Sequence, residues 1–162
     1  MASDTHIKFD GVDGEATHAD HKNEIEVLSW GWNVTNQNMG IGGGSGKGKA
    51  NPGDFHFTHN YDKASPTLAK FCAAGKHFPK VVLTARKSGE GQKDFFKVSM
   101  KEVFITSVQP SGAGSGEIME SVSMAYGSID FAYKPQTEKG GLGGGRAERQ
   151  RPTQRTATRP LV

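Results

Sequence analysis

Residues 25–34 read Ile-Glu-Val-Leu-Ser-Trp-Gly-Trp-Asn-Val, and this stretch is the clearest strand signal in the chain. Side chains of a β-strand point alternately to two faces, so every second residue shares a face. We expect one face to carry Glu26, Leu28, Trp30, Trp32 and Val34, and the other to carry Ile25, Val27, Ser29, Gly31 and Asn33. Aromatic side chains on alternate residues indicate a strand that lines a β core.

The same two-residue period recurs on both sides of this stretch. We expect further strands at 7–9, 54–61, 77–87, 94–108 and 118–133. Residues 88–92, Ser-Gly-Glu-Gly-Gln, have the length and composition of a hairpin loop between two of these strands. In the last strand, Gly127 is a candidate for a bulge or a bend.

One segment has the signals of a short helix, at about 65–74. Ser65 is a good N-cap, Pro66 suits the first helical position, and Gly75 suits the position after the last turn. Leu68, Phe71 and Cys72 would share the face that packs on the sheet. The residues therefore predict a mainly β domain, either a closed barrel or a sandwich, with one short helix.

The charge of the chain is unevenly distributed. The 162 residues carry a formal charge of +3, yet residues 138–162 hold six basic and two acidic side chains, a net +4, whereas residues 1–137 hold 14 basic and 15 acidic ones, a net −1. We therefore expect a folded domain at 1–137 and a mobile Gly- and Arg-rich tail at 138–162. A nucleic-acid partner would rest on the tail alone, and we predict none.

The sequence also indicates where in the cell the protein is found. The first ten residues contain no apolar signal-peptide core, and no stretch approaches the ~18 apolar residues of a membrane span. We expect a cytoplasmic protein without membrane insertion, although export that needs no cleavable signal stays open. Cys72 is the sole cysteine, so no intramolecular disulfide holds the fold.

Residues 36–53 form the longest predicted loop, with seven glycines and one proline. A loop much longer than a hairpin needs is typically disordered or used for contacts. Its Gly43–Ala50 segment resembles a phosphate-binding loop, but Ala50 stands where Ser or Thr should ligate magnesium, and Asn-Pro-Gly follows instead of a helix. We therefore predict no nucleotide and no other cofactor.

The remaining polar motifs do not indicate catalysis or metal binding either. His56 and His59 would point to opposite faces of a strand, and His18 and His21 could join His6 at a metal only as three loosely placed ligands, so we expect solvated histidines and no metal. Cys72 is expected to be a buried structural thiol, and no Gly-x-Ser-x-Gly elbow is present. We predict that the protein is not an enzyme.

Trp30 and Trp32 offer the main alternative function. Aromatic rings at alternate strand positions can form a stacking platform, so a sugar- or lipid-binding β module that uses these two residues is the second hypothesis. Core packing is the more common role of such a pair. A protein that stays monomeric at micromolar concentration would favour the binding module.

Several segments, in order, resemble the haemolysin-coregulated proteins (Hcp) of the type VI secretion system. They are His21–Trp32, the glycine-rich loop, Phe55-x-Phe57-Thr58, Tyr61–Leu68, Gly75–Pro79, Phe95–Val108 and Glu120–Tyr126, closing at Tyr133-x-Pro135-Gln136. The resemblance covers about residues 5–137. After the Gly140–Gly145 turn it ends, because an Arg-rich sequence replaces the Gly-Trp-Asn-like stretch common in that family.

This resemblance implies a β-barrel of two sheets flanked by one helix. It also implies a non-enzymatic subunit that forms hexameric rings, which stack into a hollow tube. The implied partners are further copies of the chain, a spike protein at the tip, a contractile sheath, and small effectors that the lumen carries and chaperones. The implied localisation is cytoplasmic before firing, and then secreted through the type VI system without a cleavable signal peptide.

The resemblance also implies two sets of contact residues. The 25–34 strand is similar to one that lines the lumen, so Ser29, Gly31 and Asn33 are expected to face the channel and the effectors. The glycine-rich loop is expected to contact the adjacent ring through Gly42, Gly43, Gly44, Ser45, Gly46 and Lys47. Deleting Gly42–Lys49 should then weaken stacking and spare the hexamers.

Overall fold

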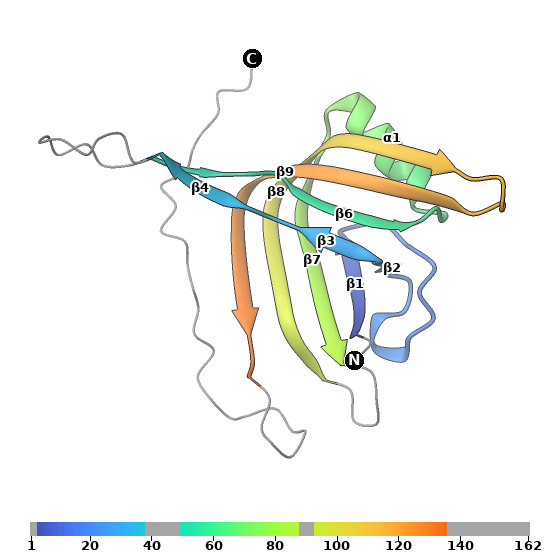
Figure 1. Ribbon diagram of the computed structural model, residues 1–162, viewed down its shortest axis with the longest axis horizontal. Helices are drawn as coiled ribbons and strands as arrows, with labels where there is room; N and C mark the ends of the chain where they lie inside the picture. The colour runs from blue at the N-terminus through green and yellow to red at the C-terminus, as the bar shows by residue number, and fades with distance from the viewer. Residues whose placement is uncertain (1–2, 38–48, 88–92, 136–162) are drawn as a thin grey trace, which may run out of the picture.

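The structure is a computed structural model that describes residues 3–37, 49–87 and 93–135. Strands make up most of it, and one α-helix and one 3₁₀ turn complete it (Figure 1). In chain order the elements are β1 (Ser3–Phe9), the 3₁₀ turn (Ala19–His21), β2 (Ile25–Glu26), β3 (Ser29–Gly31), β4 (Val34–Gln37), β5 (Lys49–Pro52), β6 (Phe55–Asn60), α1 (Ser65–Ala74), β7 (His77–Lys87), β8 (Asp94–Gly112) and β9 (Ile118–Tyr133).

Seven strands form one curled antiparallel sheet, in the order β2-β1-β7-β8-β9-β6-β3. Its two edge strands, β2 and β3, are neighbours in the sequence. The Val27 amide donates to the Thr5 carbonyl on β1, and the Leu28 amide donates to the Thr58 carbonyl on β6, both at 2.8 Å. The chain between β2 and β3 therefore joins the two edges and closes the sheet into a barrel (Figure 1).

The segment 25–34 is three strands in the structure, and the prediction of one uninterrupted strand was wrong. Ile25 and Val27 are buried, whereas Ser29, predicted to share their face, is exposed. The reason is the change of partner from β1 to β6 at Val27 and Leu28, which interrupts the alternation of faces. A third strand, β4, then leaves the barrel altogether.

The core lies inside the curled sheet. Alternate residues of β1, β6, β7, β8 and β9 supply it, and the buried set includes Ile7, Phe9, Phe55, Phe57, Leu83, Val98, Met100, Val122 and Met124. Each such side chain contributes about 1.5–3 kcal/mol by leaving water. The strands predicted at 77–87 and 118–133 have those bounds in the structure.

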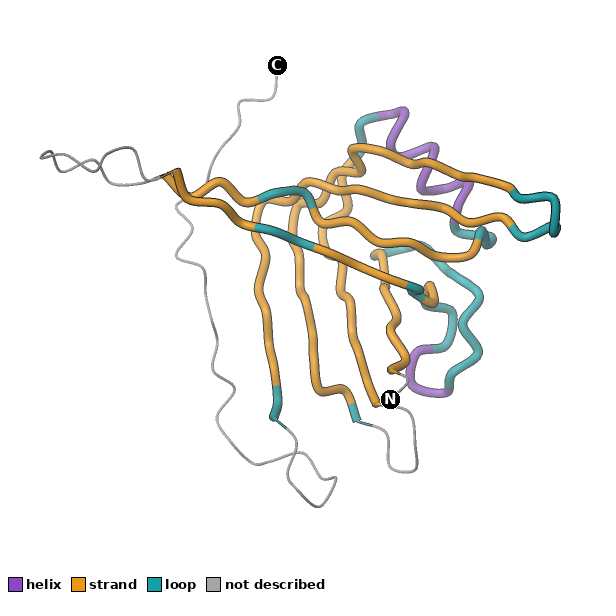
Figure 2. The backbone as a smooth tube through the Cα atoms, viewed as in Figure 1, coloured by secondary structure: helices purple, strands orange, loops and turns teal. Residues whose placement is uncertain are grey.

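The long strands β8 and β9 bend sharply along their length (Figure 2). Their pairing has a register shift between Ile105 and Ser107. Gly127 lies opposite Glu102, where the backbone of Glu102 has a positive φ of 52°, and a Cβ on Gly127 would lie 3.1 Å from the Glu102 Cβ. The irregularity expected at Gly127 is therefore present, but the unusual dihedral belongs to its partner on β8.

Helix α1 packs against the open end of the core through Leu68 and Phe71. The Phe71 ring stacks on Phe78 of β7, with centroids 4.3 Å apart. The predicted N-cap was wrong by one residue: Ser65 is the first helical residue, and its hydroxyl accepts from the Asp62 amide at 3.1 Å. Gly75 ends the helix in the left-handed region, as predicted, with a φ of 64°.

Strands β4 and β5 form a separate two-stranded sheet that projects from the barrel (Figure 2), and we call it the arm. Val34 pairs with Pro52 and Gln37 pairs with Lys49. The loop predicted at 36–53 is thus shorter than expected, because both of its ends continue a hairpin ladder. Within the described ranges, no helix is long and apolar enough to cross a membrane.

Candidate functional site

Small polar side chains share the outer face of four neighbouring strands, β3, β6, β9 and β8. Ser29 pairs with Thr58, Thr58 pairs with Ser121, and Ser121 pairs with Gln109, so these residues lie in one row across the sheet. A second row runs beside it. We call both rows together the polar face, and its members are Ser29, Gly31, His56, Thr58, Ser107, Gln109, Ser121 and Ser123.

The polar face is closely packed although it lies at the surface. The Ser29 and Thr58 hydroxyl oxygens are 2.5 Å apart. A Cβ on Gly31 would lie 2.5 Å from the His56 Nε2, so any side chain there requires the imidazole to move. Thr58, Gln109 and Ser121 also line a shallow depression of about 340 Å³. The face thus offers hydroxyl and amide groups on a nearly flat surface.

A buried hydrogen-bonded pair, His59 and Glu120, lies beside this depression. His59 Nε2 lies 3.0 Å from Glu120 Oε1, and the two side chains are 0% and 1% exposed. His56, three residues earlier on β6, is exposed. The prediction that His56 and His59 point to opposite faces of the strand is therefore confirmed. The pair fixes β6 to β9 beneath the polar face.

Of the three residues predicted to face a lumen, only two lie on the same face of the sheet. Ser29 and Gly31 belong to the polar face. Asn33 lies beyond the end of β3, where its carbonyl accepts from the Gly53 amide at 2.8 Å, so it belongs to the base of the arm. Sequence reasoning missed the β8 and β9 members; the Ser121-x-Ser123 alternation was their one local signal, and only the strand pairing places them beside Ser29.

The two tryptophans pack on other aromatic rings. The Trp30 ring stacks on Phe55 and on Phe96, at centroid distances of 5.8 and 5.2 Å. The Trp32 ring lies 4.8 Å from that of Phe131, and its Nε1 donates to the Tyr126 hydroxyl. Trp30 is 38% exposed, but both indole rings are engaged by aromatic neighbours, which favours packing over a sugar or lipid platform.

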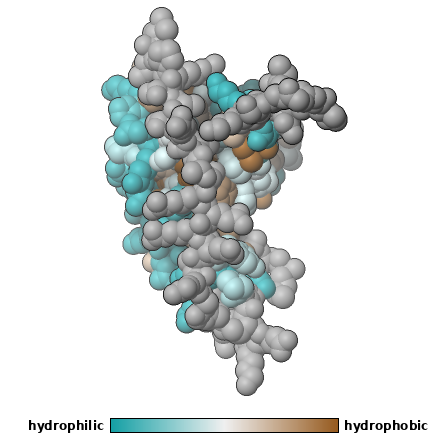
Figure 3. All heavy atoms as spheres, turned by 90° about the vertical axis from the view of Figure 1, so that its left-hand side faces the viewer, coloured by the Kyte–Doolittle hydropathy of each residue, from teal (hydrophilic) through white to brown (hydrophobic). Residues whose placement is uncertain are grey.

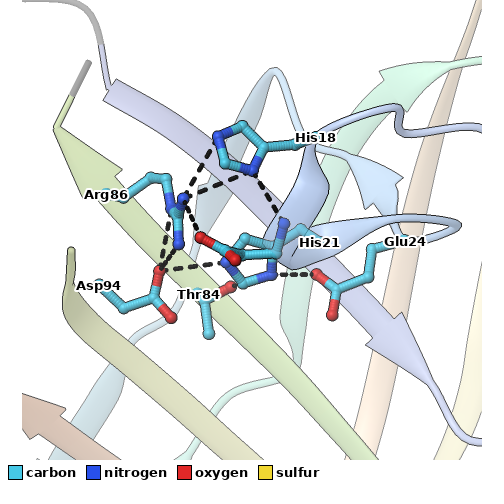
Figure 4. Close-up of polar contacts among 7 residues, drawn as sticks. His18, His21, Glu24, Thr84, Arg86 and Asp94 are labelled. Carbon is cyan, nitrogen blue, oxygen red and sulfur yellow. Dashed lines mark hydrogen bonds and ion pairs between the residues drawn. The ribbon is translucent and has the colours of Figure 1, made fainter. Parts of the chain in front are cut away.

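A second group of polar side chains lies around Arg86 on β7, where Figure 4 shows His18 and His21 close to its guanidinium. His6 on β1 stacks on His21, with ring centroids 4.9 Å apart, and His18 lies 5.9 Å from His6. His6 and His21 are buried, so the expectation of solvated histidines was wrong. The strand β1 and the 3₁₀ turn, distant in sequence from β7, bring these rings together.

Carboxylates complete this histidine–arginine cluster. The guanidinium of Arg86 donates to Asp94 Oδ1 from Nε at 3.1 Å and from Nη2 at 3.0 Å, and to Asp20 from Nη1 at 3.2 Å. His21 lies between two carboxylates, with Nδ1 2.6 Å from Glu24 and Nε2 3.1 Å from Asp94. The cluster therefore ties the 12–24 segment to β7 and β8 (Figure 4).

The electrostatics of the cluster favour neutral His6. Burial, together with neighbouring His21, His18 and Arg86, lowers the pKa of His6 to about 4, against a smaller opposing effect of Asp4. Burial acts to raise the pKa of Asp94, but hydrogen bonds from His21 and Arg86 outweigh it and lower that pKa. Among the described residues, no group of three or more His, Cys, Asp or Glu side chains could hold a metal ion.

Exposed apolar side chains gather where β6 and β9 meet the 28–29 segment. Tyr61 and Ile118 are joined by a backbone hydrogen bond of 2.8 Å, Met119 pairs with Asn60, and Leu28 and Tyr61 line one small groove. These four side chains, 42–51% exposed, form what we call the apolar edge. Figure 3 views the arm side of the molecule, where the described surface is mostly hydrophilic or neutral with small apolar areas.

The residues predicted to stack rings, Gly42, Gly43, Gly44, Ser45, Gly46 and Lys47, lie outside the described residues, as does most of the segment that resembles a phosphate-binding loop. The described part of that region is the arm itself, which has no residue in the hydrophobic core.

Comparisons with known proteins agree with this fold. The family model described as "Type VI secretion system effector, Hcp" matches residues 6–133. Protein hcp1 of Pseudomonas aeruginosa is 42% identical over 148 residues, which cover 90% of this chain and 91% of that protein. A solved structure of a type six secretion system protein is similar with a TM-score of 0.82 at 34% identity, covering 88% of this chain and 91% of the other. Hcp1 of Salmonella typhimurium is similar with a TM-score of 0.70 at 35% identity, covering 82% and 88%.

Proposed function

Since this chain belongs to the Hcp family of the type VI secretion system, we propose that it is a structural subunit of the secretion tube, which forms hexameric rings that stack into a hollow cylinder. It acts by assembly and carries no catalytic role. Its partners are other copies of the chain, the spike protein, the contractile sheath and small effectors. The subunit is cytoplasmic before firing and leaves the cell through the type VI system.

The surface of the monomer supports assembly. The apolar edge is exposed to water, and it consists of Leu28, Tyr61, Ile118 and Met119. The arm has no residue in the hydrophobic core. Exposed apolar patches and unsupported two-stranded sheets are typical of protein–protein contacts. A head-to-tail contact between copies closes into a ring when its rotation permits.

The polar face supports the expectation of a lumen surface. Five of its eight residues carry a hydroxyl, and such a surface binds many partners weakly through hydrogen bonds and water. We assign Ser29 and Gly31 to the effector contact, together with their neighbours on β6, β8 and β9. Asn33 keeps that role only if the arm base also borders the channel.

Ser29→Gln tests this assignment better than a change at Gly31, because Ser29 is exposed while a side chain at Gly31 displaces His56. The larger amide should leave rings intact and lower the amount of effector that co-purifies with the protein, measured by quantitative mass spectrometry. Ser128→Gln, an exposed serine on β9 outside the polar face, is the matched control. Equal effector recovery from wild type and both variants would contradict the lumen role.

Negative-stain imaging together with native mass spectrometry tests the proposed function itself. We expect six-membered rings and short stacks of them at micromolar concentration. A protein that stays monomeric under these conditions contradicts the proposal. An interface of the expected strength buries on the order of 1,000 Å² or more in total.

A further inference from the structure

The arm leaves the barrel through two short connections, Trp32–Asn33 before β4 and Gly53–Asp54 after β5. Every arm residue whose side chain is described is exposed or half-buried, and Val34 is 48% exposed. A two-stranded sheet of this kind is marginal in water by itself. Its direction therefore depends on how these two connections are held.

Both connections are tied to the same tyrosine on β9. The Tyr126 hydroxyl donates to the Gly53 carbonyl at 2.8 Å and accepts from the Trp32 Nε1. The Tyr126 hydroxyl therefore donates its proton to the connection that follows β5, and it accepts a hydrogen bond from the connection that precedes β4. We call Trp32, Asn33, Gly53 and Tyr126 the hub.

Further contacts leave the hub little freedom. The Gly53 amide donates to the Asn33 carbonyl at 2.8 Å, and a Cβ on Gly53 would lie 1.9 Å from the Asn33 Oδ1. Next to it, the Thr106 hydroxyl on β8 donates to Asp54 Oδ2 at 2.8 Å. The Trp32 ring also packs against Phe131. The two ends of the arm are thereby fastened to each other and to β8 and β9.

The hub hydroxyl remains a donor over the physiological range. Burial raises the pKa of Tyr126, an effect that the hydrogen bond from Trp32 opposes and the nearby charge of Asp54 assists.

We propose that Tyr126 and Trp32 are positioning residues that set the direction in which the arm leaves the barrel, and thereby the strength with which one ring docks on the next. This inference rests on the proposed function, because it assumes that the arm meets a second copy of the chain. It assigns the control of stacking to residues of the barrel wall that themselves need not touch the neighbouring ring.

Tyr126→Phe is the direct test, because it removes the hydroxyl and keeps the ring. The lost bond is the one to the Gly53 carbonyl, and without it the arm base should open more often. We therefore expect the Gly53 amide, which donates to the Asn33 carbonyl, to exchange with solvent about three- to tenfold faster. The ring–ring association constant, measured by sedimentation velocity, should fall by a similar factor while hexamers persist. Trp32→Phe, which removes the other donor, should act in the same direction.

Tyr133→Phe is the matched control, since it removes a tyrosine hydroxyl from the same strand at an exposed position that packs on Phe95. It should change neither exchange nor stacking. Unchanged Gly53 exchange in Tyr126→Phe, or faster exchange with unaltered stacking, overturns the inference. If wild-type rings do not stack at all, the proposed function fails instead, and the exchange measurement shows separately whether the hub holds the arm.

Discussion

Arg86 connects three parts of the chain through its single side chain. It is 4% exposed, and Asp20, Asp94 and His18 all lie within hydrogen-bonding distance of its guanidinium. Burial acts to lower the pKa of Arg86, but the hydrogen bonds to Asp94 and Asp20 outweigh it and raise that pKa. This permanent cation is one of the neighbours that lower the pKa of buried His6.

The stability of the protein should therefore fall in acid. His6 has a pKa of about 4 in the folded protein and an ordinary value of 6.5, so the unfolded chain binds the proton more readily between these values. The stabilisation is complete above pH 6.5 and is lost as the pH falls toward 4, by at most about 3 kcal/mol. The lowered pKa of Asp94 acts in the same direction at lower pH. Urea unfolding between pH 7 and 4.5 measures this loss.

His6→Phe is the variant that isolates the effect of His6. It keeps an aromatic ring against His21, and the buried Nδ1 that it removes has no hydrogen-bond partner. The pH dependence of unfolding should be shallower than in wild type. His77→Gln, which removes an imidazole that is 51% exposed, is the control. An equally steep pH dependence in His6→Phe would show that other groups cause the loss.

At the scale of elements, the arm is the part of the fold that differs most from the barrel. Its strands β4 and β5 pair only with each other in the described structure, whereas every other strand belongs to the curled sheet. The hub at its base and the loop at its tip therefore have separable roles. The base sets direction, and we expect the tip to make the contact.

Deletion of residues 42–47 tests the tip. It keeps β5, which begins at Lys49, whereas the Gly42–Lys49 deletion suggested by the sequence would remove the partner of Gln37. Hexamers should persist in native mass spectrometry, and ring stacking seen by electron microscopy should be lost or strongly reduced. A variant with residues 42–47 scrambled shows whether loop length suffices. Loss of hexamers and stacks together would place the loop in the ring interface.

At the scale of the whole molecule, barrel closure is the feature that holds the rest in place. The 27–28 step links β1 to β6, and the polar face, the apolar edge and the hub all include residues of the strands of this closed sheet or of the segments that adjoin them. The family match ends at residue 133, close to the end of β9. This agreement leads us to propose residues 1–137 as the folding unit and 138–162 as an appended tail.

Truncation after residue 137 should accordingly leave the barrel intact. The removed segment contains only Leu142, Leu161 and Val162 as large apolar residues, too few to offset the ordering of its backbone. We expect the free energy of unfolding in urea to change by less than about 1 kcal/mol. A loss of more than about 2 kcal/mol would mean that the tail packs on the barrel and that the proposed boundary is wrong.

Much of the fold was predictable because its signals are local. Residues 77–87 and 118–133 are rich in β-branched and aromatic residues between turn signals, and Gly75 marks the end of α1 through its own backbone dihedral. The 25–34 segment was predicted as strand but with the wrong faces, since its change of partner depends on the edge strands β1 and β6. The N-cap of α1 was wrong by one residue because Asp62 and Ser65 share the capping contacts.

The sequence by itself determined a mainly β domain, one short helix, a near-neutral body with a basic tail, and a resemblance to a secretion family. The first three follow from composition or from neighbours a few residues apart, whereas the resemblance rests on the order of similar segments over about residues 5–137. Only the tertiary structure decided that residues 25–31 close the barrel, that three histidines surround Arg86, and that Tyr126 joins both ends of the arm. These features depend on the register between strands distant in sequence, and register is set by the packing of the whole sheet.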